Sequence, residues 1–112
     1  MALLTATRPT DPGVTWTPAA VSASDTIQAS DLGSRGAFLV VINGGASPDT
    51  VGIVDAGSTP AGHTGVNGGG SVTNATTKAF YVDPATASPS TGLTTITHSF
   101  TTSVTYVLLP LG

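Results

Sequence analysis

Apolar and polar residues alternate along several short stretches of this chain. The alternation is clearest in residues 93–100 and 104–109, where one face carries Ile96, His98 and Phe100 in the first stretch and Val104, Tyr106 and Leu108 in the second. Successive side chains of a strand point to opposite faces, so this period of two predicts half-buried β-strands. Shorter stretches of strand character occur at residues 26–28, 50–54, 71–73 and 78–82.

Six or seven short strands separated by turns, with no amphipathic helix among them, predict an all-β fold. We expect a single small antiparallel β-sandwich or jelly-roll-like barrel over residues 20–112, preceded by an extended N-terminal arm over residues 1–19. A single helical turn capped by Ser24 or Asp25 is the alternative to a strand around residues 26–28.

The strongest element is residues 37–42, which are apolar on both faces. This pattern predicts a central strand covered on both sides, with Phe38, Val40 and Ile42 buried. Turn residues follow it, and the next strand, residues 50–54, presents Val51 and Ile53 on one side. We expect these two strands to form an antiparallel hairpin with a long loop.

The arm contains three prolines, at positions 9, 12 and 18. Proline lacks a backbone donor, so an extended segment is expected and not a central strand. Its apolar side chains would leave surface exposed if the arm lay free in solvent, so we expect another protein subunit to contact Leu3, Leu4, Val14 and Trp16. For Trp16 two interpretations stay open: a lid on its own core, or an anchor in a neighbouring subunit.

Composition narrows the class of protein. The 112 residues suffice for one domain, and only 8% are charged, with six aspartates, no glutamate, one lysine and twenty threonines. A net charge of −3, with Arg8, Arg35 and Lys78 far apart, argues against nucleic-acid binding. No apolar run approaches the roughly 20 residues that span a bilayer. The chain has no cysteine, which excludes disulfides and thiolate metal sites.

Candidate chemistry is sparse, and we expect no enzyme activity, cofactor or metal site. His98 lies on an apolar strand face and is expected to be a hydrogen-bonded structural residue, whereas His63 is expected to be solvated. The glycine-rich residues 57–70 lack the Gly-Lys-Ser/Thr ending of a phosphate-binding loop and are expected to form a surface excursion. Calcium between the loops of a sandwich is the open alternative, without an Asp-x-Asp-x-Asp run to support it.

Three segments together carry a resemblance to a known group of proteins. Residues 38–51 form a strand followed by Asn-Gly, Ala-Ser-Pro and Thr-Val; residues 78–84 run into an Asp-Pro turn; residues 92–107 have the form of a closing Thr- and Val-rich hairpin. In this order they resemble small proteins that accompany the major capsid protein of tailed bacteriophages, notably those infecting actinobacteria. The resemblance covers residues 20–56 and 71–109.

This resemblance implies a head decoration protein. Such proteins bind the outer face of an icosahedral shell whose subunits have the HK97-type fold, often as trimers at local three-fold positions. The implied partners are therefore the major capsid protein and further copies of the same chain, with a trimer favoured, and the implied location is the virion. The alternatives are another virion module, associated with a tail or fibre, and a carbohydrate-binding β-domain.

Overall fold

The computed structural model describes residues 2–55, 68–88 and 90–111. Short strands dominate it, and the two helical segments have four and three residues. The elements are β1 (Ala2–Leu3), β2 (Ala19–Ala20), β3 (Ser24–Gln28), α1 (Ala29–Leu32), β4 (Ala37–Asn43), β5 (Asp49–Val54), β6 (Gly68–Val72), β7 (Thr76–Val82), the 3₁₀ turn η1 (Pro84–Thr86), β8 (Leu93–His98) and β9 (Val104–Pro110).

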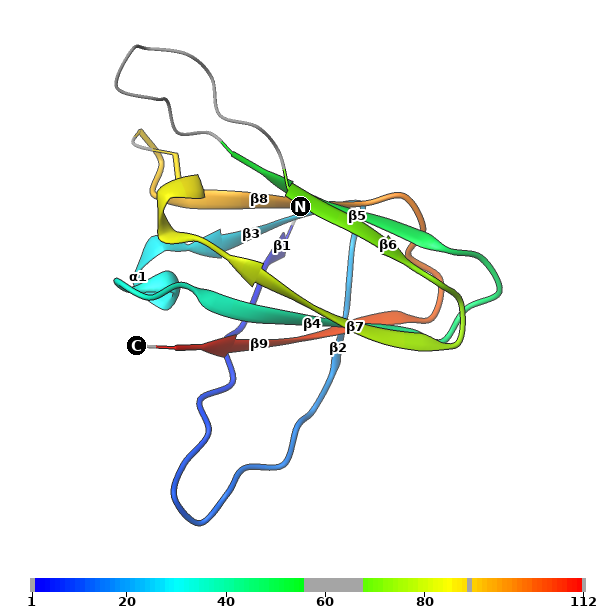
Figure 1. The fold of residues 1–112 in the computed structure, drawn as a ribbon, viewed down its shortest axis with the longest axis horizontal. Coiled ribbons are helices and arrows are strands. Elements are labelled where there is room, and N and C mark those ends of the chain that lie inside the picture. Colours follow the sequence, from blue (N-terminus) through cyan, green and yellow to red (C-terminus); the bar gives the residue numbers. More distant parts are fainter. Residues whose placement is uncertain (1, 56–67, 89, 112) are drawn as a thin grey trace.

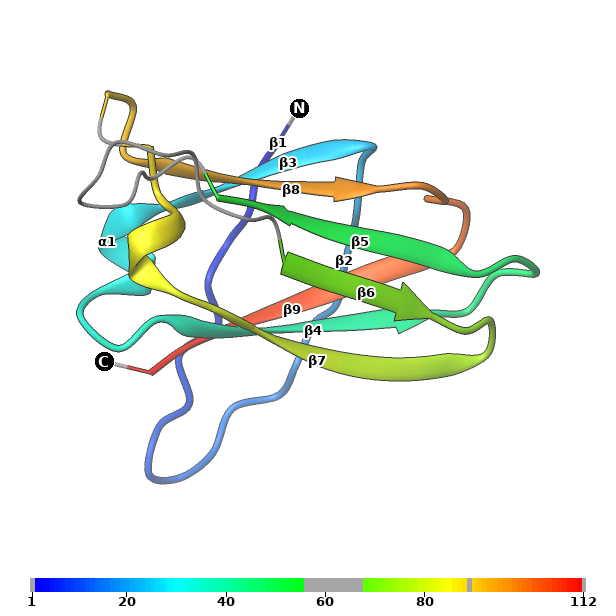
Figure 2. The ribbon, with the colours of Figure 1, turned by 45° about the horizontal axis from the view of Figure 1, so that its top comes forward.

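Two sheets are packed face to face, which confirms the predicted β-sandwich. One has the strand order β1-β3-β8-β5-β6 and the other β2-β9-β4-β7. Figure 1 shows the two layers one above the other, and Figure 2 shows β5 and β6 lying over β4 and β7. Every strand pair is antiparallel except β1 with β3.

The core lies between the inner faces of the two sheets. The predicted faces of β8 and β9 are confirmed, since Ile96, His98, Val104, Tyr106 and Leu108 are buried and Phe100 packs against the core. The predicted side of β5 is confirmed as well, because both Val51 and Ile53 are buried. Burial of alternate side chains on two facing sheets is the main source of stability in such a sandwich.

The predicted hairpin between the strongest strand and the next one is wrong. β4 pairs with β7 and β9, whereas β5 pairs with β6 and β8 in the other sheet. The connection crosses from one layer to the other, and the buried Asn43 side chain donates hydrogen bonds to the carbonyls of Ser47 (2.8 Å) and Val72 (3.1 Å). β8 and β9 also lie in different sheets, so they do not form the closing hairpin that the resemblance suggested.

β4 is a central strand as predicted, but its outer side is covered only in part. Its inner face is formed by Ala37, Leu39, Val41 and Asn43, all buried. On its outer face Val40 is buried and Ile42 partly so, whereas Phe38 is 42% exposed. The prediction that Phe38 is a core residue is therefore wrong, whereas the prediction that Val40 is buried is confirmed.

The region around residues 26–28 is strand and not helix. Ser24 and Asp25 lie within β3, and the short helix α1 begins only at Ala29, with Gln28 as its N-terminal cap. The carboxylate of Asp25 is buried and accepts hydrogen bonds from the backbone N–H of Ser22 (3.0 Å) and from its hydroxyl. The polar side chains therefore stabilise the turn that leads into the strand.

Both ends of the N-terminal segment are attached to the sandwich. β1 pairs with β3, and the backbone N–H of Thr7 donates to the carbonyl of Leu108 (2.7 Å). Further on, β2 pairs with β9. The residues between these attachments, 8–18, are all exposed and form the loop drawn in blue below β9 in Figure 1. We call residues 8–18 the arm loop.

Candidate binding face

The outward-pointing side chains of β4, β7 and β9 form a face that we call the outer face, in which Val40 and Val107 are buried and the other side chains are exposed or partly exposed. Its three rows follow from the strand register, in which Phe38 lies beside Tyr81 and Leu109, Val40 beside Ala79 and Val107, and Ile42 beside Thr77 and Thr105. None of these nine side chains is charged. The only polar groups they offer are three hydroxyls, those of Thr77, Tyr81 and Thr105.

Two aromatic rings mark one end of the outer face. Phe38 and Tyr81 meet edge to face with ring centroids 6.4 Å apart, and both remain substantially exposed. The Tyr81 hydroxyl donates a hydrogen bond of 2.8 Å to the carbonyl of Arg35, which fixes the ring. Next to it, Gly36 has a positive φ of 82°, and a Cβ at this position would collide with the Val82 carbonyl and the Tyr81 ring. The absence of a side chain at Gly36 therefore allows the Tyr81 ring to pack closely against the backbone at this position.

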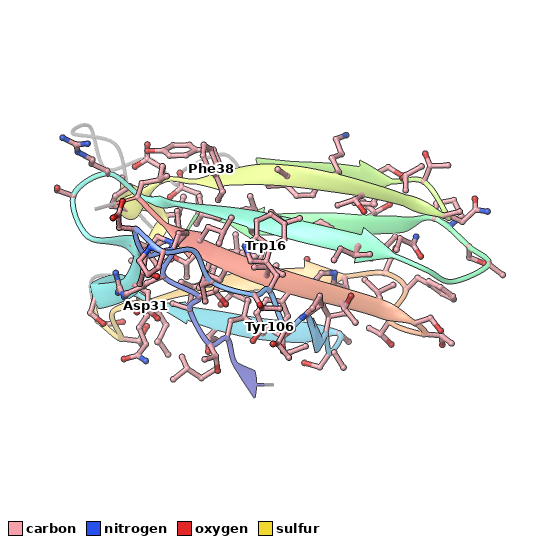
Figure 3. All side chains as sticks on the ribbon, turned by 90° about the horizontal axis from the view of Figure 1, so that it is seen from below. Trp16, Asp31, Phe38 and Tyr106 are labelled. Atoms are coloured by element: carbon pink, nitrogen blue, oxygen red, sulfur yellow. The ribbon has the colours of Figure 1, made fainter. Side chains whose placement is uncertain are left out.

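The arm loop brings a third aromatic residue to the same side of the molecule. Trp16 is 49% exposed. Figure 3, which views the molecule from this side, shows it in front of β9. At its start the loop is held by Arg8, whose guanidinium lies 3.2 Å from the carboxylate of Asp31. About half of the Trp16 side chain is therefore available for a partner, and its role as an anchor in a neighbouring subunit stays a prediction.

The four contact residues expected from the sequence fall in two different environments. Leu3, Val14 and Trp16 are exposed, as a contact residue must be. Leu4 is only 3% exposed and belongs to the core cluster, so its selection as a contact residue needs correction. The reason is local: the Leu4 N–H donates to the Thr26 carbonyl (2.8 Å), which holds the residue against β3 and turns its side chain inward.

The described residue with the most reactive side chain, His98, is enclosed in the core. Its Nδ1 lies 2.6 Å from Oδ2 of Asp49, and both side chains are almost fully buried. The other carboxylate oxygen of Asp49 accepts from the backbone N–H groups of Ser99 (3.0 Å) and Phe100 (3.2 Å). The pair therefore ties β5 to the end of β8, as expected for a structural histidine, and no substrate reaches it in this conformation.

The other candidate residues from the sequence do not form a metal site among the described residues. Within residues 2–55, 68–88 and 90–111 no three His, Asp or Glu side chains gather as a metal site would require. His63 and most of the glycine-rich segment lie outside the described residues, and its end, residues 68–70, begins strand β6. Of the aspartates beside turns, Asp83 caps η1 by accepting from the N–H of Ala85 at 2.8 Å. No helix among the described residues is long and apolar enough to cross a membrane.

Sequence reasoning overlooked the outer face, although a signal for it was present. Phe38, Tyr81 and Leu109 each lie at an alternate position of a strand whose opposite face is also apolar. A sandwich buries only one face of each sheet, so apolar residues on both faces of a strand indicate either a third layer or an exposed binding surface. Among the described residues the outer face is covered only in part, because Val40 and Val107 are buried whereas Phe38 and Tyr81 are exposed.

Comparisons of the chain with protein-family models, with curated proteins and with solved structures found no match. Function must therefore be argued from the outer face, the arm loop and the chemistry of their side chains.

Proposed function

We propose that this protein decorates the outside of a bacteriophage capsid, where its outer face and arm loop bind the major capsid protein and stabilise the shell. The observation that carries the proposal is the outer face itself: nine side chains without a charge, of which seven are exposed or partly exposed, and on the same side the half-exposed Trp16. The resemblance of residues 20–56 and 71–109 to decoration proteins supports the identity of the partner.

The chemistry of the face suits a protein partner. The cores of protein interfaces are depleted of charged residues and enriched in aromatic ones, and binding energy concentrates in a few Trp, Tyr and Arg residues. Phe38 and Trp16 supply such anchors on one side of the molecule, together with Tyr81, whose ring contacts that of Phe38. Hydroxyl and backbone groups cost much less to desolvate than unpaired ions, so a threonine-rich, low-charge surface packs against a shell at little penalty.

Multiple attachment would strengthen a small contact. A homo-oligomer, of which the resemblance favours a trimer, engages several shell subunits at once and gains avidity without new contacts. The role needs no catalytic residue or cofactor, and the proposal assigns none to this chain.

The test is binding to capsids. Mature, DNA-filled capsids of the phage that encodes the chain, prepared without this protein, are mixed with the purified protein and separated on a density gradient. We expect saturable binding at a fixed number of copies per shell and a higher melting temperature of the decorated shell. Absence of binding, or binding that does not saturate, would reject the proposal.

Carbohydrate binding is a second candidate, favoured by one observation. Glycan sites on β-sandwiches use exposed aromatic side chains on a sheet face, and the exposed Trp16 lies on the same side of the molecule as the contacting rings of Phe38 and Tyr81. Against it, a sugar needs several directed polar groups beside the stacking rings, and the outer face offers only three hydroxyls. Retention on insoluble polysaccharides, relieved by a soluble oligosaccharide, would favour this candidate over decoration.

A further inference from the structure

The sandwich has four outer strand edges among the described residues, and three of them are blunted. β1 and β2, at one end of each sheet, have only two residues each. β6 begins with three glycines, of which Gly69 has a φ of 113°. Short edge strands and glycine irregularities are common ways in which proteins prevent unwanted edge-to-edge pairing.

β7 is the exception. It has seven residues and no proline, and it pairs with β4 residue for residue without a bulge. Its one charged residue, Lys78, already has partners within the chain. Lys78 Nζ donates to the Ser71 carbonyl (3.2 Å) and lies 5.6 Å from the centroid of the Phe80 ring, so the ammonium group does not prevent another strand from pairing with β7. A long and regular edge strand without proline or bulge is a ready template for another strand.

We infer that β7 pairs antiparallel with β7 of a second copy of this chain. Pairing all seven residues places Ala79 on the two-fold axis, opposite itself. The same register puts Thr77 opposite Tyr81 of the second copy and Lys78 opposite Phe80 of the second copy. The two lysines are therefore diagonal neighbours and not directly opposite each other, and each lies opposite an aromatic ring, the kind of neighbour that Lys78 already has within its own chain.

The register also keeps the two outer faces on the same side. In an antiparallel pair directly opposite residues point to one face, so Ala79 against Ala79 joins outer face to outer face. The four-stranded sheets of two copies then form one continuous sheet, and the uncharged surface doubles in width. This two-fold contact does not depend on capsid binding, and it differs from the three-fold arrangement that the resemblance implies.

A single cysteine tests the pairing, because the natural chain contains none. In the proposed dimer the Cα atoms of an Ala79→Cys pair lie about 4.5–5.5 Å apart, within the range of about 4.4–6.8 Å that a disulfide requires. The matched control is Thr77→Cys, on the same strand and the same face, whose two copies are separated by about 14 Å along the strands.

We expect the wild-type protein to sediment at twice its chain mass of 11.0 kDa at micromolar concentration. Under mild oxidation the A79C protein should form a covalent dimer at least about tenfold faster than the T77C protein. Equal rates for both variants, no covalent dimer from A79C, or a wild-type protein that is monomeric or trimeric would each overturn the inference. If the free protein was monomeric and a β7 variant lost shell binding, the inference would be wrong, and the edge of β7 would instead contact the shell protein.

Discussion

Leu39 and Phe38 are neighbours in β4 and are similarly apolar, but they lie in opposite environments. Leu39 points into the sandwich and is 1% exposed, whereas Phe38 points out and is 42% exposed. The same contrast extends across the sheet. Val41, Tyr106 and Leu108 face the core, while Ile42, Tyr81 and Leu109 face outward.

We expect the two faces of β4 to have different roles, the inner face in folding and the outer face in binding. The inner face is apolar because the two sheets must bury it against each other. The outer face is apolar without such a need, and a soluble monomer rarely keeps a contiguous apolar patch without a function. Substitutions on the inner face should therefore change stability, and substitutions on the outer face should change binding.

The largest effect on stability is expected from the polar pair in the core. His98→Asn removes the partner of a buried carboxylate, so the free energy of unfolding should fall by roughly 3–5 kcal/mol. Urea unfolding followed by Trp16 fluorescence measures this change. The double variant D49N/H98N should lose less than the two single variants together, because the buried charge is gone. A loss below about 1 kcal/mol for His98→Asn would show that the pair does not hold β5 to β8.

The next effect compares the two faces directly. Leu39→Ala should lower the free energy of unfolding by about 2–5 kcal/mol through lost burial and a cavity. Phe38→Ala should lower it by only about 1–1.5 kcal/mol, because the ring is partly in solvent already. Both values come from the same unfolding titration. Equal losses for the two variants would mean that the outer face is part of the core.

A smaller change is expected for the arm loop, and it should affect binding. Trp16→Ala should weaken attachment to capsids by about 2 kcal/mol, or about 30-fold, as is typical of a tryptophan at the centre of an interface. Val14→Ala in the same loop serves as the control and should cost several-fold less. Copies bound per shell, measured by cosedimentation over a range of protein concentrations, give both values. A Trp16→Ala variant with unchanged affinity would assign the ring a structural role only.

The sequence predicted the strands well and their partners poorly. β4, β5, β7, β8 and β9 were recognisable because period-two patterns and turn residues are local signals. The sheet to which each strand belongs depends on contacts between distant residues, such as the pairing of Val51 with His98, and no local pattern reports them. The expected hairpin between β4 and β5 was wrong for that reason.

Which face of β4 is buried could not be predicted from the sequence of that strand either. In a strand where apolar and polar residues alternate, the apolar residues mark the buried face. β4 is apolar at every position from Ala37 to Ile42, so its sequence does not show which of its two faces is buried. The buried face of β4 follows from its pairing with the neighbouring strand β9. Val104, Tyr106 and Leu108 of β9 alternate clearly, and their register with β4 places Leu39 and Val41 on the inner side. Knowledge of strand pairing is therefore needed before the outer face can be seen.

The most direct test of the account is a charge placed on the outer face. Phe38→Lys introduces an ammonium group where the proposed shell contact would desolvate it, and Gln28→Lys places the same group on an exposed residue at the end of β3 in the opposite sheet. Capsid binding should fall at least about 30-fold for Phe38→Lys and stay within about twofold for Gln28→Lys, with both proteins folded by circular dichroism. Undiminished binding of a folded Phe38→Lys protein would contradict the assignment of the outer face as the attachment surface.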